Sequence, residues 1–297
     1  MNNNKILLYI SLYLFCYEVC LTQVRVGDWN SLTSCLQIRD IEFIEDTLFA
    51  ATEGGILTMV GQENKVITNI DGLKGVDILS IEKDMNGNLW IGGNSPYGFL
   101  QSYNPFAKKS LSYFEFNLTS ISDIQVADSV TWVLFNVGQD DGLMKFMYNE
   151  EWQYRDSYKN FPDEITKINC FLVKDSMIII GTNNGIYSSN IYSNLKNPSS
   201  WVKIVQNFNE EVSSISSSSE FLVFTTINGL HKYSFVFDEI INEDLPANLD
   251  NPNNIFIINN EYWFSDNNFI YVYKDNELLF FENRDNILTI TNNGDKR

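Results

Sequence analysis

Short apolar runs recur along this chain at a nearly constant spacing. "LWIGG" begins at Leu89, and comparable runs begin at Leu48, Thr131, Ile178, Leu222 and Tyr262, each roughly 40 to 47 residues from its neighbour. No 3.6-residue hydrophobic periodicity separates the runs, so they predict strands and not helices. Self-similarity at a fixed period of this length indicates a repeat architecture.

Three further short segments accompany each run. One precedes it, as "ILSIE" at Ile78; one follows a turn, as "NNGIYSSN" at Asn183; and one comes last, as "EWQYRD" at Glu151. Four strands recurring at this period are the signature of a β-propeller blade. A β-sandwich would not repeat its own sequence, and a parallel β-helix would repeat at a shorter period. We therefore predict an all-β fold, a β-propeller of four-stranded antiparallel blades.

The two ends of the repeat region bear on the number of blades. After six complete sets of strands, "NILTITNNGDKR" (Asn286–Arg297) repeats an inner strand and its turn. We expect an inner strand near Ile287–Thr291. "VGDWNSLT" from Val26 resembles an outermost strand, which in propellers often pairs with the last blade and removes a sheet edge. The prediction is a seven-bladed propeller over residues 24–297 with its last blade incomplete, a gap beside Trp29, and a truncated reading frame.

The second strand of a blade lies between neighbouring sheets, which explains the tryptophan inside "LWIGG". A strand buried on both faces reads as a continuous apolar run, and a large ring such as Trp90 or Trp263 fills the wedge between two blades. The glycine that follows lets the hairpin turn tightly and the adjacent blade approach. We interpret Trp90 as core packing and not as a ligand contact.

Two stretches of the repeat resemble a known family. "NIDGLKGVDILSIEKDMNGNLWIGG" (Asn69–Gly93) resembles the two-component-regulator propeller repeat, and "IIIGTNNGIY" at Ile178 is a second good match. The first two blades, from Val26, are similar to the amino-terminal propeller of PorZ-like proteins. That resemblance implies a surface component of the type IX secretion machinery of Bacteroidetes. The repeat also forms the input region of hybrid histidine kinases, which implies a periplasmic, ligand-sensing head.

The first residues have the pattern of an export signal. Lys5 precedes the apolar run "ILLYISLYLF", which is too short to span a bilayer. We predict a signal peptide over residues 1–22, no membrane span in the mature chain, and a location in the periplasm or on the outer cell surface. The net charge of −18 repels phosphate and anionic lipid, which argues against nucleic acid as a partner.

Residues that could carry catalysis are few. His231 is the one histidine of the chain, which argues against both a nucleophile–histidine site and a multi-histidine metal site. Asp40, Glu42 and Asp123 fall on predicted first strands, which line a propeller's channel. There they would be solvated polar side chains or, as the alternative, the paired carboxylates of a glycosidase. We expect no catalytic residue.

Metal and thiol chemistry are also disfavoured. "DMNGN" at Asp84 is interpreted as a tight turn, because it lacks the downstream glutamate of a calcium loop. Cys16 and Cys20 leave with the signal peptide, and Cys35 and Cys170 are expected to be buried free thiols. No Cys/His spacing suits a metal. We therefore expect no cofactor and no metal.

Three classes of function are compatible with these features. The first is an exported, non-enzymatic binding or scaffolding propeller, whose partners are proteins of a surface secretion complex or a glycan. The second is the sensing head of a hybrid two-component regulator, which would need a membrane span and a kinase after the last blade. The third is a propeller lyase or glycosidase, which the shortage of histidines disfavours.

The turns suggest where a ligand or partner would bind. The turn between second and third strands is short in "GTNNGI", but blades two and three lengthen it to "GGNSPYGFL" and "FNVGQDDGL". Loops longer than the structural minimum tend to carry recognition. We therefore predict Tyr97, Asp140 and Asp141 as contacts to a ligand or partner.

Overall fold

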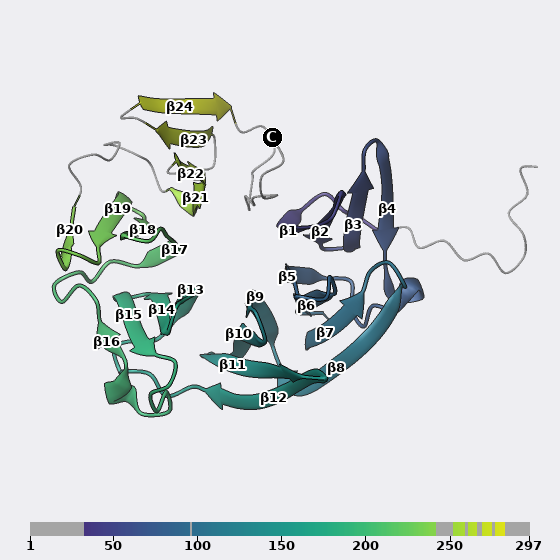
Figure 1. Ribbon diagram of the computed structural model, residues 1–297, viewed down its shortest axis with the longest axis horizontal. Coiled ribbons are helices and arrows are strands. Elements are labelled where there is room, and N and C mark those ends of the chain that lie inside the picture. The colour runs from purple at the N-terminus through teal and green to yellow at the C-terminus, as the bar shows by residue number, and fades with distance from the viewer. Residues whose placement is uncertain are drawn as a thin grey trace, which may run out of the picture. The chain divides into compact units, whose positions relative to one another are not determined.

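The described residues form six antiparallel sheets of four strands each. The computed structural model describes residues 33–95, 97–241, 252–258, 261–265, 269–274 and 277–282. Within every sheet the four strands pair in chain order, so each sheet is one blade with its first strand innermost (Figure 1). The all-β propeller with four-stranded blades is therefore confirmed.

The strand bounds follow the predicted runs closely. First strands are β1 (Ile38–Ile44), β5 (Ile78–Lys83), β9 (Ser120–Ala127), β13 (Ile168–Lys174), β17 (Val212–Ser217) and β21 (Asn253–Ile258). Second strands are β2 (Thr47–Thr52), β6 (Leu89–Gly93), β10 (Val130–Val137), β14 (Met177–Thr182), β18 (Phe221–Thr226) and β22 (Glu261–Ser265).

The outer half of each blade is more variable in length. Third strands are β3 (Gly55–Val60), β7 (Gly98–Asn104), β11 (Asp140–Asn149), β15 (Gly185–Asn190), β19 (Gly229–Ser234) and β23 (Phe269–Lys274). Fourth strands are β4 (Glu63–Ile67), β8 (Lys109–Leu118), β12 (Glu151–Tyr158), β16 (Val202–Lys203), β20 (Glu239–Ile240) and β24 (Glu277–Glu282).

Helical structure is minor in the part of the chain that the structure describes. It consists of two 3₁₀ segments, η1 (Asn69–Asp71) and η2 (Pro198–Ser200). Neither has the length and apolar character that crossing a membrane requires.

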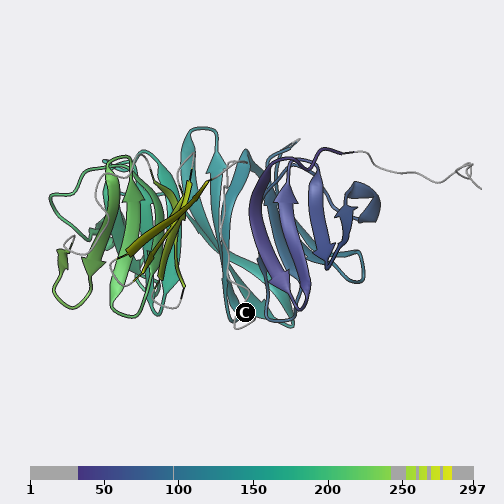
Figure 2. The same cartoon turned by 90° about the horizontal axis from the view of Figure 1, so that it is seen from above.

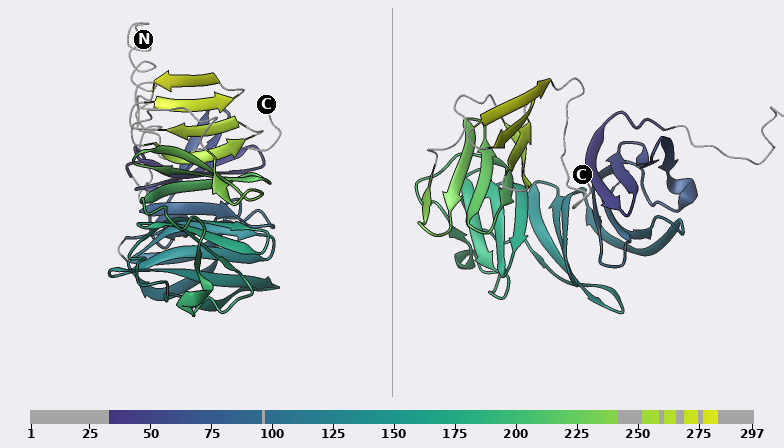
Figure 3. Two further views of the ribbon diagram at one scale, coloured as in Figure 1. Left: turned by 90° about the vertical axis from the view of Figure 1, so that its left-hand side faces the viewer. Right: turned by 45° about the horizontal axis from the view of Figure 1, so that its top comes forward.

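The blades follow one another around a common channel. Each inner strand contacts the inner strand of the next blade, from β1 through β21, and Figure 3 shows the same succession from two further sides. In Figure 2 the strands run between two faces. The linker face carries the blade-to-blade linkers and the turns between second and third strands, and the opposite face carries the other turns.

The described residues contain six four-stranded blades, which is the number of complete blades that the sequence predicted. The inner strand expected at Ile287–Thr291, the gap beside Trp29 and the signal peptide over residues 1–22 all lie outside the described residues.

Neighbouring blades pack through the second strands, as predicted for Trp90. Its side chain is fully buried, and its ring lies 5.1 Å from that of Phe146 and 5.2 Å from that of Trp152 on the next blade. A Cβ on Gly92 would meet Cγ2 of Ile121 at 2.2 Å. Glycine at this position therefore permits the next blade to approach, as the sequence predicted.

Candidate functional site

The inner strands of all six blades line a cavity of about 460 Å³. Blades one to three contribute four carboxyl groups, those of Asp40, Glu42, Glu82 and Asp123, whereas the wall formed by the later blades includes Cys170, Phe171, Ser214 and Ile255. The placement of Asp40, Glu42 and Asp123 beside the channel is confirmed, and Glu82 joins them. The cavity is acidic on one side and neutral on the other.

A recurring irregularity of the strands positions these side chains. In blades one to five the first strand shifts register against the second strand near its start, so one residue is skipped. The residue after the shift is Asp40, Ser80, Asp123, Cys170 or Ser214 in blades one to five. A bulge re-aims the side chain that follows it, so the same position of each repeat borders the channel.

Several polar side chains of the inner strands form hydrogen bonds to the backbone of the next blade. Asp40 Oδ2 accepts from Ile81 N at 2.9 Å and from Ser80 Oγ at 3.1 Å. Gln125 accepts from Val173 N at 2.9 Å and donates to Phe171 O at 2.6 Å. These bonds satisfy the strand edges that face the channel, which would otherwise be open for pairing.

Asn169 and Ser214 do the same for the later blades. Asn169 Nδ2 donates to Val212 O at 2.9 Å, and Ser214 Oγ accepts from Ile255 N at 3.2 Å. The polar residues of the inner strands therefore connect the blades to one another, a role that periodicity alone did not reveal.

Crowding of the carboxyl groups changes their protonation. Burial raises the pKa of Asp40 to about 6, against hydrogen bonds that lower it. Burial and the charges of Glu42 and Asp40 raise the pKa of Glu82 well above its usual value, and burial with the Asp40 charge does the same for Asp123. Like charges this close oppose one another's ionisation, so Asp40, Glu82 and Asp123 on this wall of the channel ionise at higher pH than free carboxyl groups.

The predicted binding residues lie on the linker face, where the sequence placed them. Tyr97 is 77% exposed on the turn between β6 and β7. The corresponding turn of blade three is only Gly138 and Gln139, because β10 and β11 extend to meet it. The expectation of a lengthened loop there is wrong, since the additional residues lengthen the strands instead.

Asp140 and Asp141 therefore begin β11. They line a hollow of about 370 Å³ between blades three and four, together with Lys159, Phe161 and Lys167. Asp141 Oδ2 accepts from Ile168 N at 2.7 Å, which fastens the entry to blade four. Tyr97 does not belong to this hollow. The structure thus brings together two of the three predicted residues, and their binding role stays a prediction.

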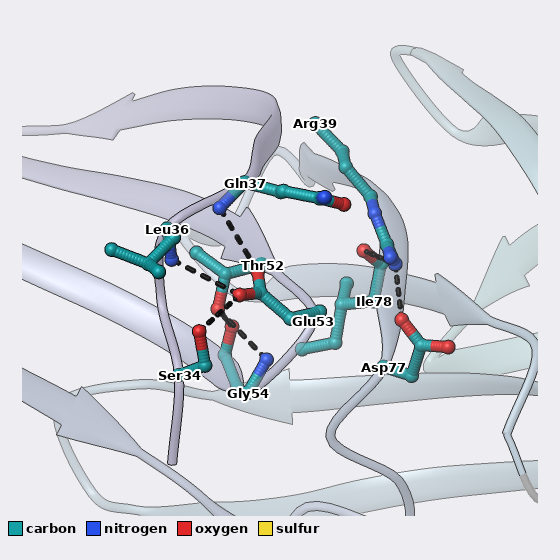
Figure 4. Close-up of polar contacts among 10 residues, drawn as sticks. Ser34, Leu36, Gln37, Arg39, Thr52, Glu53, Gly54, Asp77 and Ile78 are labelled. Atoms are coloured by element: carbon teal, nitrogen blue, oxygen red, sulfur yellow. Dashed lines mark hydrogen bonds and ion pairs between the residues drawn. The ribbon is translucent and has the colours of Figure 1, made fainter. Parts of the chain in front are cut away.

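A carboxylate on the linker face of blade one was not singled out from the sequence. Glu53, in the turn between β2 and β3, accepts from Ser34 Oγ at 2.5 Å, Leu36 N at 3.1 Å and Gln37 N at 3.0 Å (Figure 4). Burial opposes ionisation, but these bonds and its own N–H lower the pKa of Glu53 to about 2.

The turn sequence was the signal that could have identified Glu53. Asn183 holds the same place in blade four, after Thr182, and its Oδ1 accepts from Thr166 N and Lys167 N. Thr52 and Thr182 each bond the carbonyl of the glycine three residues later, Gly55 and Gly185. A threonine followed by Glu or Asn in this turn therefore marks the residue that fastens the incoming linker.

The remaining residues singled out from the sequence have structural surroundings. Asp84 Oδ1 accepts from Asn86 N and Asn88 N, both at 2.9 Å, which confirms the tight turn. His231 stacks on Phe224, and burial lowers its pKa. Cys35 and Cys170 are free thiols, as expected, but both are only partly buried. No group of His, Cys, Asp and Glu suited to a metal occurs among the described residues.

Comparison with known proteins shows the fold. No family model and no curated protein sequence matches the chain. The structure resembles PorZ, a bacterial surface component of the type IX secretion system of Porphyromonas gingivalis, with a TM-score of 0.59 and 17% identity over 85% of this chain and 40% of that one. The sequence resemblance to PorZ-like proteins is therefore matched by a structural resemblance to PorZ.

Two further neighbours widen the comparison. The extracellular domain of BT4673 from B. thetaiotaomicron, described as a hybrid two-component system, gives a TM-score of 0.65 at 14% identity over 86% of this chain and 36% of that one. The WD40 β-propeller domain of Doa1 gives 0.65 at 10% identity over 88% and 89%. The chain spans well under half of PorZ and BT4673, and at these identities the likeness establishes the β-propeller fold alone.

Proposed function

We propose that this chain is an exported β-propeller that binds or scaffolds partners and does not catalyse a reaction. The use of the inner-strand polar groups supports this most directly. Both oxygens of Asp40 accept backbone N–H groups, from Ile41 and Ile81, and Glu42 accepts from Phe43 N and Lys83 Nζ. A general acid or base must be free to exchange a proton with a substrate, and these groups are occupied in hydrogen bonds within β1 and to blade two.

The location of two structural neighbours supports export. PorZ is a bacterial surface component and the BT4673 domain is extracellular. We propose the periplasm or the outer cell surface as the location, and a PorZ-like part in type IX secretion as the specific role. The alternative is a ligand-sensing propeller of a hybrid two-component regulator, which the likeness to BT4673 favours.

Deletion of the gene in the source bacterium distinguishes these roles. A PorZ-like role predicts loss of type IX cargo from the cell surface and medium, restored by the wild-type gene. Normal secretion with loss of a transcriptional response to an external ligand would support the sensor instead. A protein that fractionates with the cytoplasm would contradict both.

The proposal that the protein does not catalyse a reaction has a separate test. Purified protein is expected to leave polysaccharide substrates of lyases and glycosidases unchanged. Turnover that disappears in Asp40→Asn or Glu82→Gln, with the fold retained, would overturn it.

A further inference from the structure

Blades four and five have unusually short outer strands. β16 and β20 contain 2 residues each, whereas β8 contains 10 and β12 contains 8. Only Tyr187 and Ser188 of β15 pair with β16, and only Tyr233 and Ser234 of β19 pair with β20. The outer strands of these two blades therefore cover less of the third strands than those of blades two and three.

An apolar groove of about 420 Å³ lies between these two blades. Met177 and Ile204 line it from blade four, and Tyr233 and Phe235 line it from blade five. Met177, Ile204 and Phe235 also pack against the buried cluster that contains Ile179 and Phe224. The floor of this groove, the blade 4–5 groove, is thus continuous with the hydrophobic core and fixed in position.

Exposed apolar side chains lie beside the groove. Val202 is 57% exposed, and Val236 and Phe237 are 70% and 68% exposed. Val202 pairs with Ser188, which lines the groove, so the two side chains point to the same side of the blade. Val236 and Phe237 directly follow Phe235. Apolar surface gathered around a groove is typical of an interaction site.

Charge selects among possible occupants. Lys174, the cation in the groove, donates to Ser218 O, and its Nζ lies 4.6 Å from the Phe235 ring centre, so its charge is already engaged. Asp175 lines the groove, and Glu220 adjoins it through the bond from Phe235 N to Glu220 O. Neither forms an ion pair with a described residue. Two acidic residues, Asp175 and Glu220, therefore lie at or beside the groove against one lysine, Lys174.

We propose that the blade 4–5 groove binds an extended segment of a partner protein, with an apolar side chain in the groove and a lysine or arginine beside it. The chain's net charge of −18 disfavours a second copy and an anionic lipid, whereas a basic, apolar segment complements both floor and rim. This inference rests on the proposed binding role and names its surface and the chemistry of its partner.

The test uses a labelled peptide and purified protein. The probe is a fluorescein-labelled heptapeptide of alternating lysine and apolar residues, Lys-Leu-Lys-Phe-Lys-Leu-Lys, with a counterpart in which glutamate replaces each lysine. Fluorescence anisotropy should show binding of the basic peptide that weakens as salt is added. Equal binding of the acidic peptide, or binding indifferent to salt, would overturn the charge assignment.

Surface variants locate the binding. Val202→Ser with Phe237→Ser should weaken binding of the basic peptide about tenfold or more. Asp175→Asn with Glu220→Gln should reduce the salt dependence. The control pair, Ile70→Ser with Leu111→Ser, changes exposed apolar residues elsewhere and should bind like the wild type. All of these variants alter exposed side chains, and matching thermal unfolding curves would verify their folding. Equal binding by both apolar pairs would overturn the proposal.

Two further outcomes separate this inference from the function it rests on. Concentration-dependent dimerisation that Val202→Ser with Phe237→Ser abolishes would make a second copy the occupant and contradict the proposal. Normal secretion in cells that carry this double variant in place of the wild-type gene would refute the groove while leaving the binding role intact. Loss of secretion with this pair, but not with the control pair, would support both.

Discussion

At the scale of single residues, the same chemical group serves two opposite purposes. Glu53 is ionised and receives N–H and O–H groups from the linker that enters blade one. Asp40 also receives hydrogen bonds, but burial and the neighbouring Glu42 raise its pKa. Folding lowers the pKa of a carboxyl group where hydrogen bonds to the carboxylate dominate, and raises it where the loss of hydration dominates.

Replacing Glu53 with glutamine should destabilise the protein by about 1–2 kcal/mol at pH 7. The pKa of Glu53 is lowered in the folded state, so its stabilising contribution is present above the unfolded value of 4.5 and disappears as the pH falls toward 2. Urea denaturation at several pH values measures the difference. Glu63→Gln, in an exposed ion pair, is the control and should change little. A Glu53→Gln effect that persists unchanged at pH 2 would contradict this account.

Asp40→Asn should make stability less dependent on pH. In the wild type the pKa of Asp40 is raised from 3.8 to about 6, so the folded state takes up a proton first and the free energy of unfolding rises as the pH falls from 7 to 4. That gain is up to roughly 3 kcal/mol for this group. The variant carries no titrating group there, and denaturation at pH 7 and pH 4.5 should show a smaller gain. An equal gain in both proteins would refute the assignment.

At the scale of elements, a blade is held to its neighbour by a wedge of aromatic rings and by the absence of side chains where backbones meet. Trp90, Phe114, Phe146 and Trp152 fill the space between blades two and three. Gly92 and Gly181 leave room for the inner strand of the following blade. A large ring and a glycine two positions apart on β6, Trp90 and Gly92, therefore act together: the ring fills the space between blades, and the glycine makes room for the next inner strand.

Trp90→Ala and Trp90→Phe should lower the free energy of unfolding by different amounts. Trp90→Ala leaves a cavity in the centre of the wedge and should cost about 3–5 kcal/mol. Trp90→Phe should cost clearly less, because the indole N–H makes no hydrogen bond to any described residue and one aromatic ring still fills part of the space. Equilibrium unfolding in urea provides both values. Equal losses would show that the ring does not contribute through packing.

Gly92→Ala should destabilise the interface between blades two and three by about 1–3 kcal/mol. The new Cβ would lie 2.2 Å from Cγ2 of Ile121 and 2.7 Å from its Cβ. Ala51 occupies the corresponding position of blade one, since Ala51 pairs with Asp40 as Gly92 pairs with Ser80. Ala51→Gly is therefore the matched control and should cost no more than about 1 kcal/mol. The comparison fails if Gly92→Ala is as stable as the wild type.

At the scale of the whole molecule, hydrogen bonds between inner strands hold successive blades together. Four of the inner strands bond the next one through polar side chains, namely β1, β9, β13 and β17. A group that lies on the channel wall is therefore protected only while successive blades stay together.

Cys170 provides a reporter for that protection. Its thiol lies on the channel wall, and burial raises its pKa well above the ordinary value. Each unit of increase removes about nine-tenths of the reactive thiolate at a given pH. In a Cys35→Ser background, Cys170 should react with a thiol reagent at least about tenfold more slowly than in urea, with the rate following global unfolding. Rapid labelling of the folded protein would contradict the raised pKa of its thiol.

The repeat and its strands could be predicted from the sequence because their signals are local. Alternation, glycine and asparagine at turns and the length of apolar runs act over a few residues, and all six second strands lie where the runs placed them. The position of Asp40, Glu42 and Asp123 on first strands, and so beside a channel, follows from the same periodicity. The extension of β10 and β11 to Val137 and Asp140 did not follow, because a polar hairpin can continue a ladder or leave it with little change in composition.

Only the tertiary structure decided which side chains meet across the repeats. Ile81 N reaches Asp40 across 41 residues, and Phe171 O reaches Gln125 across 46; contacts at that separation depend on the angle between blades, which no local pattern encodes. The blade 4–5 groove likewise exists because two consecutive outer strands stop after 2 residues each beside each other in space. Sequence therefore specified the strands, and packing between blades specified the surfaces and protonation states, because burial and charge depend on neighbours that the chain brings together only on folding.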